Sequence, residues 1–517
     1  MKKKMLIISI FILISVFLSI GKVFAVLPGI YWWSAIYMQN IGSGDGSVMM
    51  EAYDDPTYAE SDIFDFGFGQ GLIYDPGKVM DYPFGPYVGF DPALPAEFEG
   101  SVVLSANVPV AAVSEIANYG NGTVGGIGTA SARYQGATAE TVDTSLFMGK
   151  IKNNFAGHTT TIYVQAAGSD AAVTATYNMN DGNTYYQTET IQANRMFMFD
   201  PSGAGVPSTD CGYNANTSRC YGSLSLDSSS GPIAATIVEH PHNGTPAGFA
   251  MSTRVQTPSD FSSKIFHPAV KNEFWGKMNA SAAVMNVGTE TALVRITLTV
   301  TGVSPGSTAD IGDIYNDEME IGPGESKVFS KFQDNLGGMP SGTYASAVIE
   351  SIDDVAHDPQ PLISSTNDRK SSPALPGGYG IKLYSGFPEH KTTNAIAAPI
   401  IIENIGELTG TLTMQNVGSA PAKITYTYYQ YGSSNVYSFE TVDLINVGQA
   451  INTNHISDET DGDKFKILSG FNSFSELNNK KFSIIATSDQ PFIGLGAEYN
   501  VNDMRDMCDY EVINFVP

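Results

Sequence analysis

One short motif decides the fold, because it occurs four times along the chain. It reads IYMQNIGS (Ile36–Ser43), IYVQAAGS (Ile162–Ser169), AAVMNVGT (Ala282–Thr289) and LTMQNVGS (Leu412–Ser419). Runs such as ALVRITLTV and AKITYTYYQ follow it, and they alternate apolar and polar residues as a strand with one buried face does. We expect the glycine to supply a left-handed turn between strands, and the preceding Gln or Asn to bond the backbone at that turn.

A second motif follows each copy of the first and carries a shared serine: Ser101, Ser223, Ser346 and Ser483. In three copies it reads as a strand, a Ser/Asp turn, a proline and a second strand. Copy three departs from this pattern with the longer stretch SIDDVAHDPQPLISS (Ser351–Ser365). Both motifs repeat at a period near 120 residues, which indicates tandem copies of one folding unit.

The repeats predict an all-β chain of four tandem immunoglobulin-like β-sandwich domains, extended as a rod. Polar segments rich in Gly, Pro, Ser and Thr place the boundaries near residues 143, 262 and 392. The predicted domains are residues 26–143, 144–262, 263–392 and 393–517.

Residues 1–25 are typical of a secretory signal peptide: three lysines, an apolar run and a small-residue cleavage site ending at Ala25. The alternative is an uncleaved membrane anchor, for which the apolar run is short. No later stretch predicts a transmembrane segment. The formal charge is −26, and removal of the four lysines in 1–25 makes it −30, which disfavours nucleic acid and anionic membranes as partners.

Two half-domains resemble bacterial immunoglobulin-like domains of the cell-adhesion-related (CARDB) type. These are NVGTETALVRITLTVTG (Asn286–Gly302), followed by MEIGPGESKVF (Met319–Phe329), and QNVGSAPAKITYTYYQYG (Gln415–Gly432). The resemblance is weaker in copies one and two. It implies surface display, adhesion or the spacing of other modules, and it brings no catalytic residues.

Cys211 and Cys220 enclose a short turn-rich loop, and export predicts a disulfide between them, with two free thiols as the alternative. Cys508 is expected to be buried and inert, although it could cross-link two chains. His240 and His242 could flank a metal with Glu239, but a polar hairpin end explains them more simply. Glu115, Glu239 and Glu498 recur at one place in three copies. We expect a structural role for them, since residues in different domains cannot form one active site.

Acidic clusters are the candidate ligand sites. The densest predicts a calcium site and comprises Asp458, Glu459, Asp461 and Asp463. Two sparser clusters lie at Asp353, Asp354 and Asp358, and at Asp310, Asp313, Asp317 and Glu318. Solvated loops explain all three clusters equally well.

These observations predict a secreted structural or adhesive protein of a bacterial cell surface, without catalysis. Its expected partners are copies of itself, other surface proteins or glycans. The alternative is an array of carbohydrate-binding or other ligand-binding modules. Aromatic residues of copy one could then form the platform: Tyr31, Trp32, Trp33, Tyr53, Tyr58, Phe64 and Phe66. The four copies differ most in their loops, so recognition, if there is any, is expected in those unshared loops.

Overall fold

The computed structural model describes residues 32–516, except 55–57, 76–84, 91–92, 96–97, 119–129, 243–249, 373–374, 407, 455, 461 and 501–507. The predicted signal peptide therefore lies outside the described residues. The described chain is nearly all β, as predicted, and its helical segments are single turns of three or four residues. None of these helices is long and apolar enough to span a bilayer.

Copy two shows the arrangement of strands most clearly. Its eight strands are β10 (Ser145–Lys152), β11 (His158–Ala166), β12 (Ala171–Met179), β13 (Thr184–Ile191), β14 (Met196–Phe199), β15 (Tyr221–Ser228), β16 (Ile233–Pro241) and β17 (Met251–Arg254). They form two sheets, ordered β10-β15-β12-β13 and β14-β11-β16-β17. Alternate residues of β12, such as Val173 and Tyr177, point into the apolar core between the two sheets.

Copy three repeats this order. Its strands are β18 (Lys264–Asn272), β19 (Met278–Asn286), β20 (Ala292–Val303), β21 (Ile314–Ile321), β22 (Ser326–Ser330), β23 (Thr343–Ile352), β24 (Leu362–Ser372) and β25 (Leu375–Ser385). They form the sheets β21-β20-β23-β18, with the short β26 (Phe387–Pro388) at its edge, and β22-β19-β24-β25.

Copies one and four are variations on the same order. Copy one comprises β1 (Trp32–Asn40), β2 (Gly46–Tyr53), β3 (Tyr58–Glu60), β4 (Phe64–Phe66), β5 (Gly71–Tyr74), β6 (Tyr87–Val88), β7 (Ser101–Ala106), β8 (Val110–Asn118) and β9 (Ala130–Gln135). Copy four comprises β27 (Thr393–Glu403), β28 (Leu408–Asn416), β29 (Ile424–Gln430), β30 (Val436–Thr441), β31 (Ala450–Asn452), β32 (Phe465–Ser469), β33 (Lys480–Asn500), β34 (Cys508–Glu511) and β35 (Ile513–Asn514). The long β33 pairs with β27 and β29 through its first half and with β28 and β34 through its second, so it belongs to both layers.

The sequence did not predict a strand order, and the observed order differs from that of an immunoglobulin domain. In an immunoglobulin domain the first strand joins the sheet of the second, and the sixth and seventh strands are neighbours. In copies two and three the first strand pairs with the sixth, and the second pairs with the seventh. The packed sheets are observed, but this strand order does not confirm that the copies are immunoglobulin-like domains. The boundaries near 143, 262 and 392 stay predictions, since strand pairing alone does not show where a folding unit ends.

The repeated motif works partly as expected. The side-chain oxygens of Asn40, Asn286 and Asn416 accept bonds from the backbone N–H two residues later, at 2.9, 2.8 and 2.9 Å. The role expected for the motif glycine is met only by Gly168, since Gly42, Gly418 and Gly288 do not adopt its left-handed conformation. Gly288 shows why. A Cβ there would lie 2.4 Å from Gln360 Oε1, so the glycine serves close packing instead.

Copy three keeps the proline of the second motif despite its longer polar stretch. In every copy the backbone N–H just before the motif glycine donates to a proline carbonyl at 2.9–3.1 Å; the acceptors are Pro109, Pro232, Pro361 and Pro491. The polar stretch of copy three is therefore an insertion ahead of a conserved contact.

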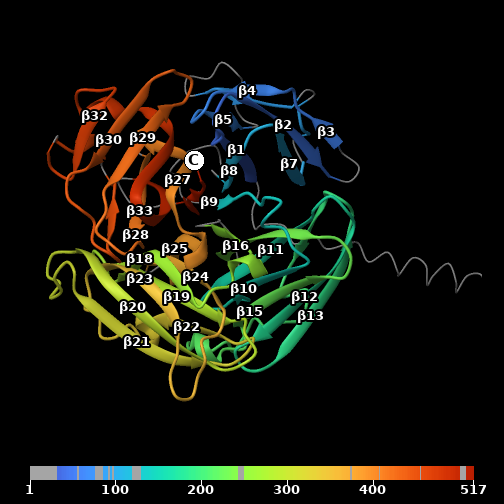
Figure 1. Ribbon diagram of the computed structural model, residues 1–517. Helices are drawn as coiled ribbons and strands as arrows, with labels where there is room; N and C mark the ends of the chain where they lie inside the picture. The colour runs from blue at the N-terminus through green and yellow to red at the C-terminus, as the bar shows by residue number, and fades with distance from the viewer. Residues whose placement is uncertain are drawn as a thin grey trace, which may run out of the picture.

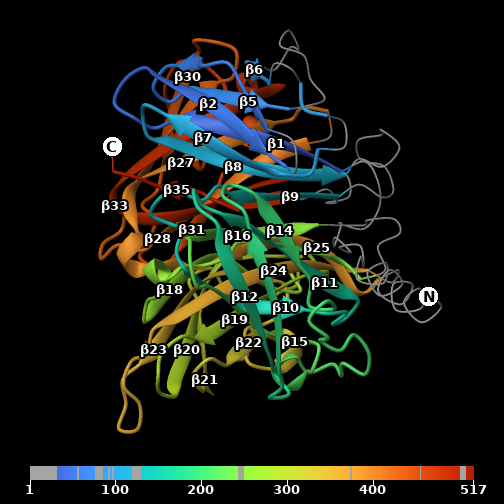
Figure 2. The same ribbon diagram turned by 90° about the vertical axis from the view of Figure 1, so that its right-hand side faces the viewer.

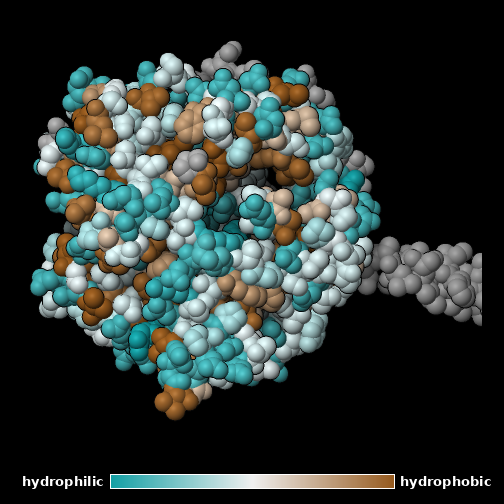
Figure 3. Space-filling view, in the orientation of Figure 1, coloured by the Kyte–Doolittle hydropathy of each residue, from teal (hydrophilic) through white to brown (hydrophobic). Residues whose placement is uncertain are grey.

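The four copies close into a ring, which corrects the expected rod. Figure 1 shows them in chain order around a common centre, with the orange and red copy four beside the blue copy one. Seen from the side, copies one and four lie above copies two and three (Figure 2). The strands β9, β17, β25 and β34, which lie near the end of each copy, meet at the centre, each in contact with the next and β34 with β9. The middle of one face is hollowed, and hydrophilic residues gather there (Figure 3).

Candidate functional site

The four serines of the second motif mark the junctions of the ring. Each hydroxyl is buried and donates to a backbone carbonyl of the next copy. The pairs are Ser101 with Asn194, Ser223 with Gly324 at 3.3 Å, Ser346 with Gly448, and Ser483 with Gly69 at 2.7 Å. The last pair links copy four back to copy one, so the same contact that joins successive copies also closes the ring.

The acceptor carbonyls belong to equivalent turns. Asn194, Gly69, Gly324 and Gly448 all have a positive φ, between 62° and 79°. In three copies the glutamine of the first motif reaches the same carbonyl from within its own copy; the donors are Gln39, Gln165 and Gln415, at 3.2, 3.2 and 3.3 Å. The two sequence motifs therefore meet at one backbone oxygen. Copy three has Met285 at the glutamine position, so this junction lacks the second donor.

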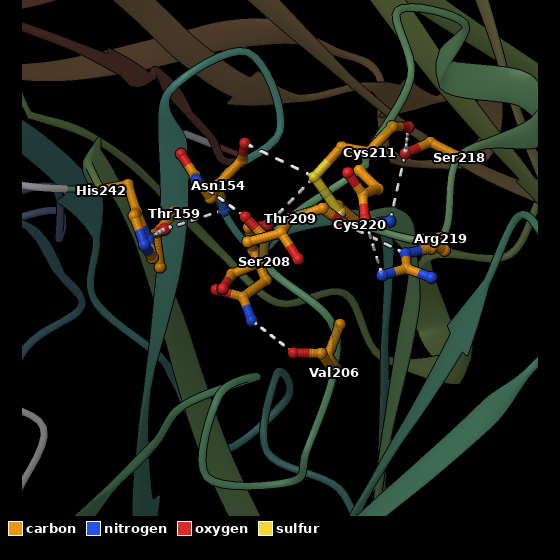
Figure 4. The surroundings of a disulfide bond; sticks show 12 residues. Asn154, Thr159, Val206, Ser208, Thr209, Cys211, Ser218, Arg219, Cys220 and His242 are labelled. Atoms are coloured by element: carbon orange, nitrogen blue, oxygen red, sulfur yellow. Dashed lines mark hydrogen bonds and ion pairs between the residues drawn. A yellow bond between two sulfur atoms is a disulfide. The ribbon is translucent and has the colours of Figure 1, made fainter.

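The predicted disulfide between Cys211 and Cys220 is present, and its loop lies against copy three. Figure 4 shows the surroundings of the bond, including Ser218, whose hydroxyl donates to the carbonyl of Cys211 at 2.6 Å. Asn216 Oδ1 accepts the backbone N–H of Val328 in copy three at 2.8 Å. Cys220 also shares an apolar cluster with Ala283 and Val328. This unshared loop is therefore part of an internal junction, where we had expected a recognition surface.

Each copy has a buried carboxylate in the equivalent strand: Glu239, Asp368 and Glu498 occupy the same position, and Glu115 lies one residue earlier. Asp368 was missed from the sequence because it is an aspartate in an altered context. The signal was present, since it lies seven residues after Pro361, as Glu239 does after Pro232 and Glu498 after Pro491. Asp368 forms an ion pair with Lys271 of its own copy.

Carboxylates of different copies do meet, contrary to the expectation from sequence. Arg133 of copy one lies 2.7 Å from Glu115 and 2.8 Å from Glu498 of copy four. Burial alone would raise the pKa of Glu115, but the Arg133 guanidinium holds it below its usual value. Burial raises the pKa of Glu498, and the nearby charge of Glu115 raises it further. One arginine thus joins the first and last copies through a buried triad.

A second buried cluster surrounds Glu239. Its carboxylate lies 2.6 Å from both Lys150 and Lys152 and 2.7 Å from His158, and Arg369 of copy three approaches to 3.6 Å. Burial would raise the pKa of Glu239, but the lysines hold it well below its usual range. The cluster neutralises charge at the junction of copies two and three.

The histidines proposed as metal ligands beside Glu239 point elsewhere. His240 contacts Thr161 at 3.0 Å and the Pro241 carbonyl, and His242 contacts Thr159 at 2.6 Å. Glu239 is engaged by the lysines, so the three residues do not converge on one point. A polar hairpin end therefore explains these residues.

The predicted calcium loop is partly described. Glu459 forms an ion pair with Lys464 at 2.9 Å, Asp463 accepts the Thr460 hydroxyl, and Asp458 ends the single-turn helix η5 (Ile456–Asp458). Asp461 lies outside the described residues. Within the described part of the chain, no three His, Cys, Asp or Glu residues gather to hold a metal ion. The four-residue calcium site stays a prediction.

The other candidates are placed as follows. Tyr31 and the side chain of Cys508 lie outside what the structure describes. Phe66 is buried, Trp33 packs against the core of copy four, and Tyr58 is half exposed, so the copy-one aromatics do not form one open platform. Of the sparser acidic clusters, Asp354 is held by His357 at 2.9 Å and Asp313 accepts the Asp310 N–H.

Comparisons with known proteins give little further guidance. No family model matches the chain, and neither does any curated protein sequence. Among solved structures, "Crystal Structure of Thermotoga maritima 1070" is 22% identical over 25% of this chain and 95% of its own, with a TM-score of 0.18. A "tetra-tandem repeat in extending region of large adhesion protein" is 10% identical over 91% of both chains, with a TM-score of 0.11. These scores are too low for either likeness to support an argument about function.

Proposed function

We propose that the protein is an exported structural or adhesive protein of a bacterial cell surface, which acts as a closed ring of four β-rich copies and performs no catalysis. The observation that carries the proposal is the closing junction, where Ser483 bonds the Gly69 carbonyl and Arg133 bridges Glu115 and Glu498. A chain that is closed on itself presents four lobes in fixed positions.

Several further features support this role. The conserved polar groups serve the junctions: the serines and glutamines share backbone carbonyls, and the buried carboxylates are neutralised by arginine and lysine. A disulfide is typical of proteins that fold in an oxidising compartment. The strong negative charge favours basic or cation-bridged partners over nucleic acid. Fixed lobes suit multivalent attachment, because a rigid spacing lets several weak contacts act together.

The experiment is to express the full chain in a bacterial host with its first 31 residues, and to treat intact cells with a protease. Surface display predicts cleavage of the protein without lysis, and adhesion or aggregation of these cells that exceeds that of cells lacking the chain. A matched control carries Arg133→Gln and Ser483→Ala, which weakens ring closure but leaves the outer loops unchanged; it should adhere less. Retention of the protein inside the cell, or equal adhesion with and without it, would contradict the proposal.

A further inference from the structure

In copies two and three, an asparagine at the end of the first strand makes the same hydrogen bond. Asn153 Nδ2 donates to the Val206 carbonyl and Asn272 Nδ2 to the Met339 carbonyl, both at 2.6 Å. In each copy the next residue has a positive φ. Copy four has the same backbone feature at Asn404, with a φ of 49°, so Glu403 occupies the asparagine position. An ionised carboxylate has no N–H to donate, so this copy needs a different partner at that place.

Glu403 has no hydrogen-bonding partner for either oxygen and is fully buried. Two side-chain oxygens on neighbouring segments are in the same state. Thr409, across the turn from β27 into β28, is fully buried with an unbonded hydroxyl, and the side-chain oxygen of Asn454, in the loop before η5, is buried and unbonded. Removing a carboxylate from water without a partner costs several kcal/mol, so an ionised Glu403 requires compensation.

The end of β27 is tied to the acidic loop of copy four. Asn404 Nδ2 donates to Ser457 Oγ at 2.7 Å and to Asn478 Oδ1 at 2.5 Å. Ser457 precedes Asp458, which is exposed at the end of η5. Burial raises the pKa of Glu403 well above its usual value, and the charge of Asp458 raises it further. A buried and an exposed carboxylate thus lie next to residues that a hydrogen bond joins, Asn404 and Ser457.

We propose that copy four binds a hard divalent cation such as calcium between Glu403 and Asp458, with the neutral oxygens of Thr409 and Asn454 beside it. Calcium takes six to eight oxygen ligands and accepts hydroxyl, amide and carbonyl oxygens together with carboxylates. The site shares Asp458 with the loop predicted from sequence, but its innermost ligand is Glu403, which that prediction did not include. The inference is independent of an adhesive role, because it concerns only the interior of copy four.

The test uses the full exported chain, freed of metal with EDTA and then titrated with calcium chloride by calorimetry and thermal unfolding. Calcium is expected to bind and to raise Tm by several degrees, since a ligand that binds only the folded state stabilises it. Glu403→Asn installs the residue of copies two and three and should abolish both the binding heat and the rise in Tm. Asp489→Asn, which removes an exposed carboxylate of copy four outside the candidate clusters, should leave both unchanged.

Two outcomes would overturn the proposal. If wild-type protein shows no calcium-dependent rise and Glu403→Gln is equally stable, Glu403 is a neutral acid and holds no cation. If Glu403→Asn and Glu403→Gln keep the full calcium response, the cation binds in the acidic loop without Glu403. Glu403→Gln preserves the shape of the side chain, so the test stands even if the asparagine variant fails to fold.

Discussion

Replacing Ser483 with alanine removes the donor that closes the ring. The hydroxyl is fully buried, and its bond of 2.7 Å to the Gly69 carbonyl joins residues at opposite ends of the chain. Gln39 Nε2 approaches the same carbonyl at 3.2 Å, so the oxygen keeps one side-chain donor in the variant. A net hydrogen bond contributes about 1 kcal/mol, so Ser483→Ala should lower the free energy of unfolding by roughly that amount.

Removing both donors should cost more than the sum of the single changes. Gln39→Met installs the side chain that copy three has at the equivalent Met285. With Ser483→Ala as well, the carbonyl has neither side-chain donor, and an unsatisfied buried group costs about 1–3 kcal/mol. The double variant should therefore lose about 3 kcal/mol and show a coupling energy of roughly 1 kcal/mol.

Urea unfolding of the wild type, both single variants and the double variant measures this cycle, and small-angle X-ray scattering reports whether the ring opens. Ser223→Ala is the matched control, since the Gly324 carbonyl has only the longer serine bond at 3.3 Å. Strictly additive effects would refute the shared-carbonyl junction. A Ser483→Ala change within about 0.3 kcal/mol of zero would refute any role for the serine in closure.

Three further predictions follow from the ring and its buried groups. Burial lowers the pKa of His158 and His267 to about 3, so only the unfolded chain takes up protons there as pH falls from about 6 to 5. The free energy of unfolding should then fall by up to about 1.4 kcal/mol per pH unit for each histidine. His267→Gln should remove the contribution of that histidine to the pH dependence. If urea unfolding gives the same pH dependence for the variant and the wild type, the prediction is wrong. The double change Cys211→Ser and Cys220→Ser opens a loop whose ends are separated by 9 residues, which should lower the free energy of unfolding by about 2.6 kcal/mol. It should also speed hydrogen exchange at the Val328 amide, which is bonded to this loop. An unaltered exchange rate would show that the loop does not stabilise the contact with copy three. A circular permutant, opened between copies two and three and joined from residue 516 to residue 32 by a flexible Gly/Ser linker, should fold with the scattering profile of the native chain, whereas a rod could not accommodate it.

The strands and the repeat were predictable because their signals are local. Alternating residues in ALVRITLTV are enough to specify a half-buried strand, and a cysteine pair around a short loop is enough to suggest its disulfide. The junctions were not predictable, because a serine that donates to a backbone carbonyl leaves no signature at the acceptor. Gly69 and Asn194 play the same part although their side chains differ. Only their shared positive φ relates them, and that is a property of the folded backbone.

The carboxylates show how a regularity can be visible and still be misread. Glu115, Glu239 and Glu498 were recognised as recurrent, but a row of separate domains would have kept them apart. Ring closure brings Glu498 to Arg133, more than 300 residues away in the chain. The charge of Arg133 is then shared between the first and last copies. Removing one member of such a buried triad leaves an uncompensated charge, so the recurrence of the acid among the copies is explained by assembly of the ring.

The loops that differ between copies now divide into two kinds. The cysteine loop of copy two lies over the β19–β22 pair of copy three, where Met285 has replaced the glutamine donor and the serine bond is longest. The cysteine loop, which the other copies lack, therefore strengthens the junction between copies two and three, where the repeated contacts are weakest. In copy four, Glu403 departs in the opposite sense, because it replaces a satisfied asparagine with a buried carboxylate that lacks a partner. The ring explains a departure that strengthens one of its junctions, but it does not explain a fully buried carboxylate without a partner, which the cation proposed above would supply. The search for what this protein binds should therefore begin in copy four.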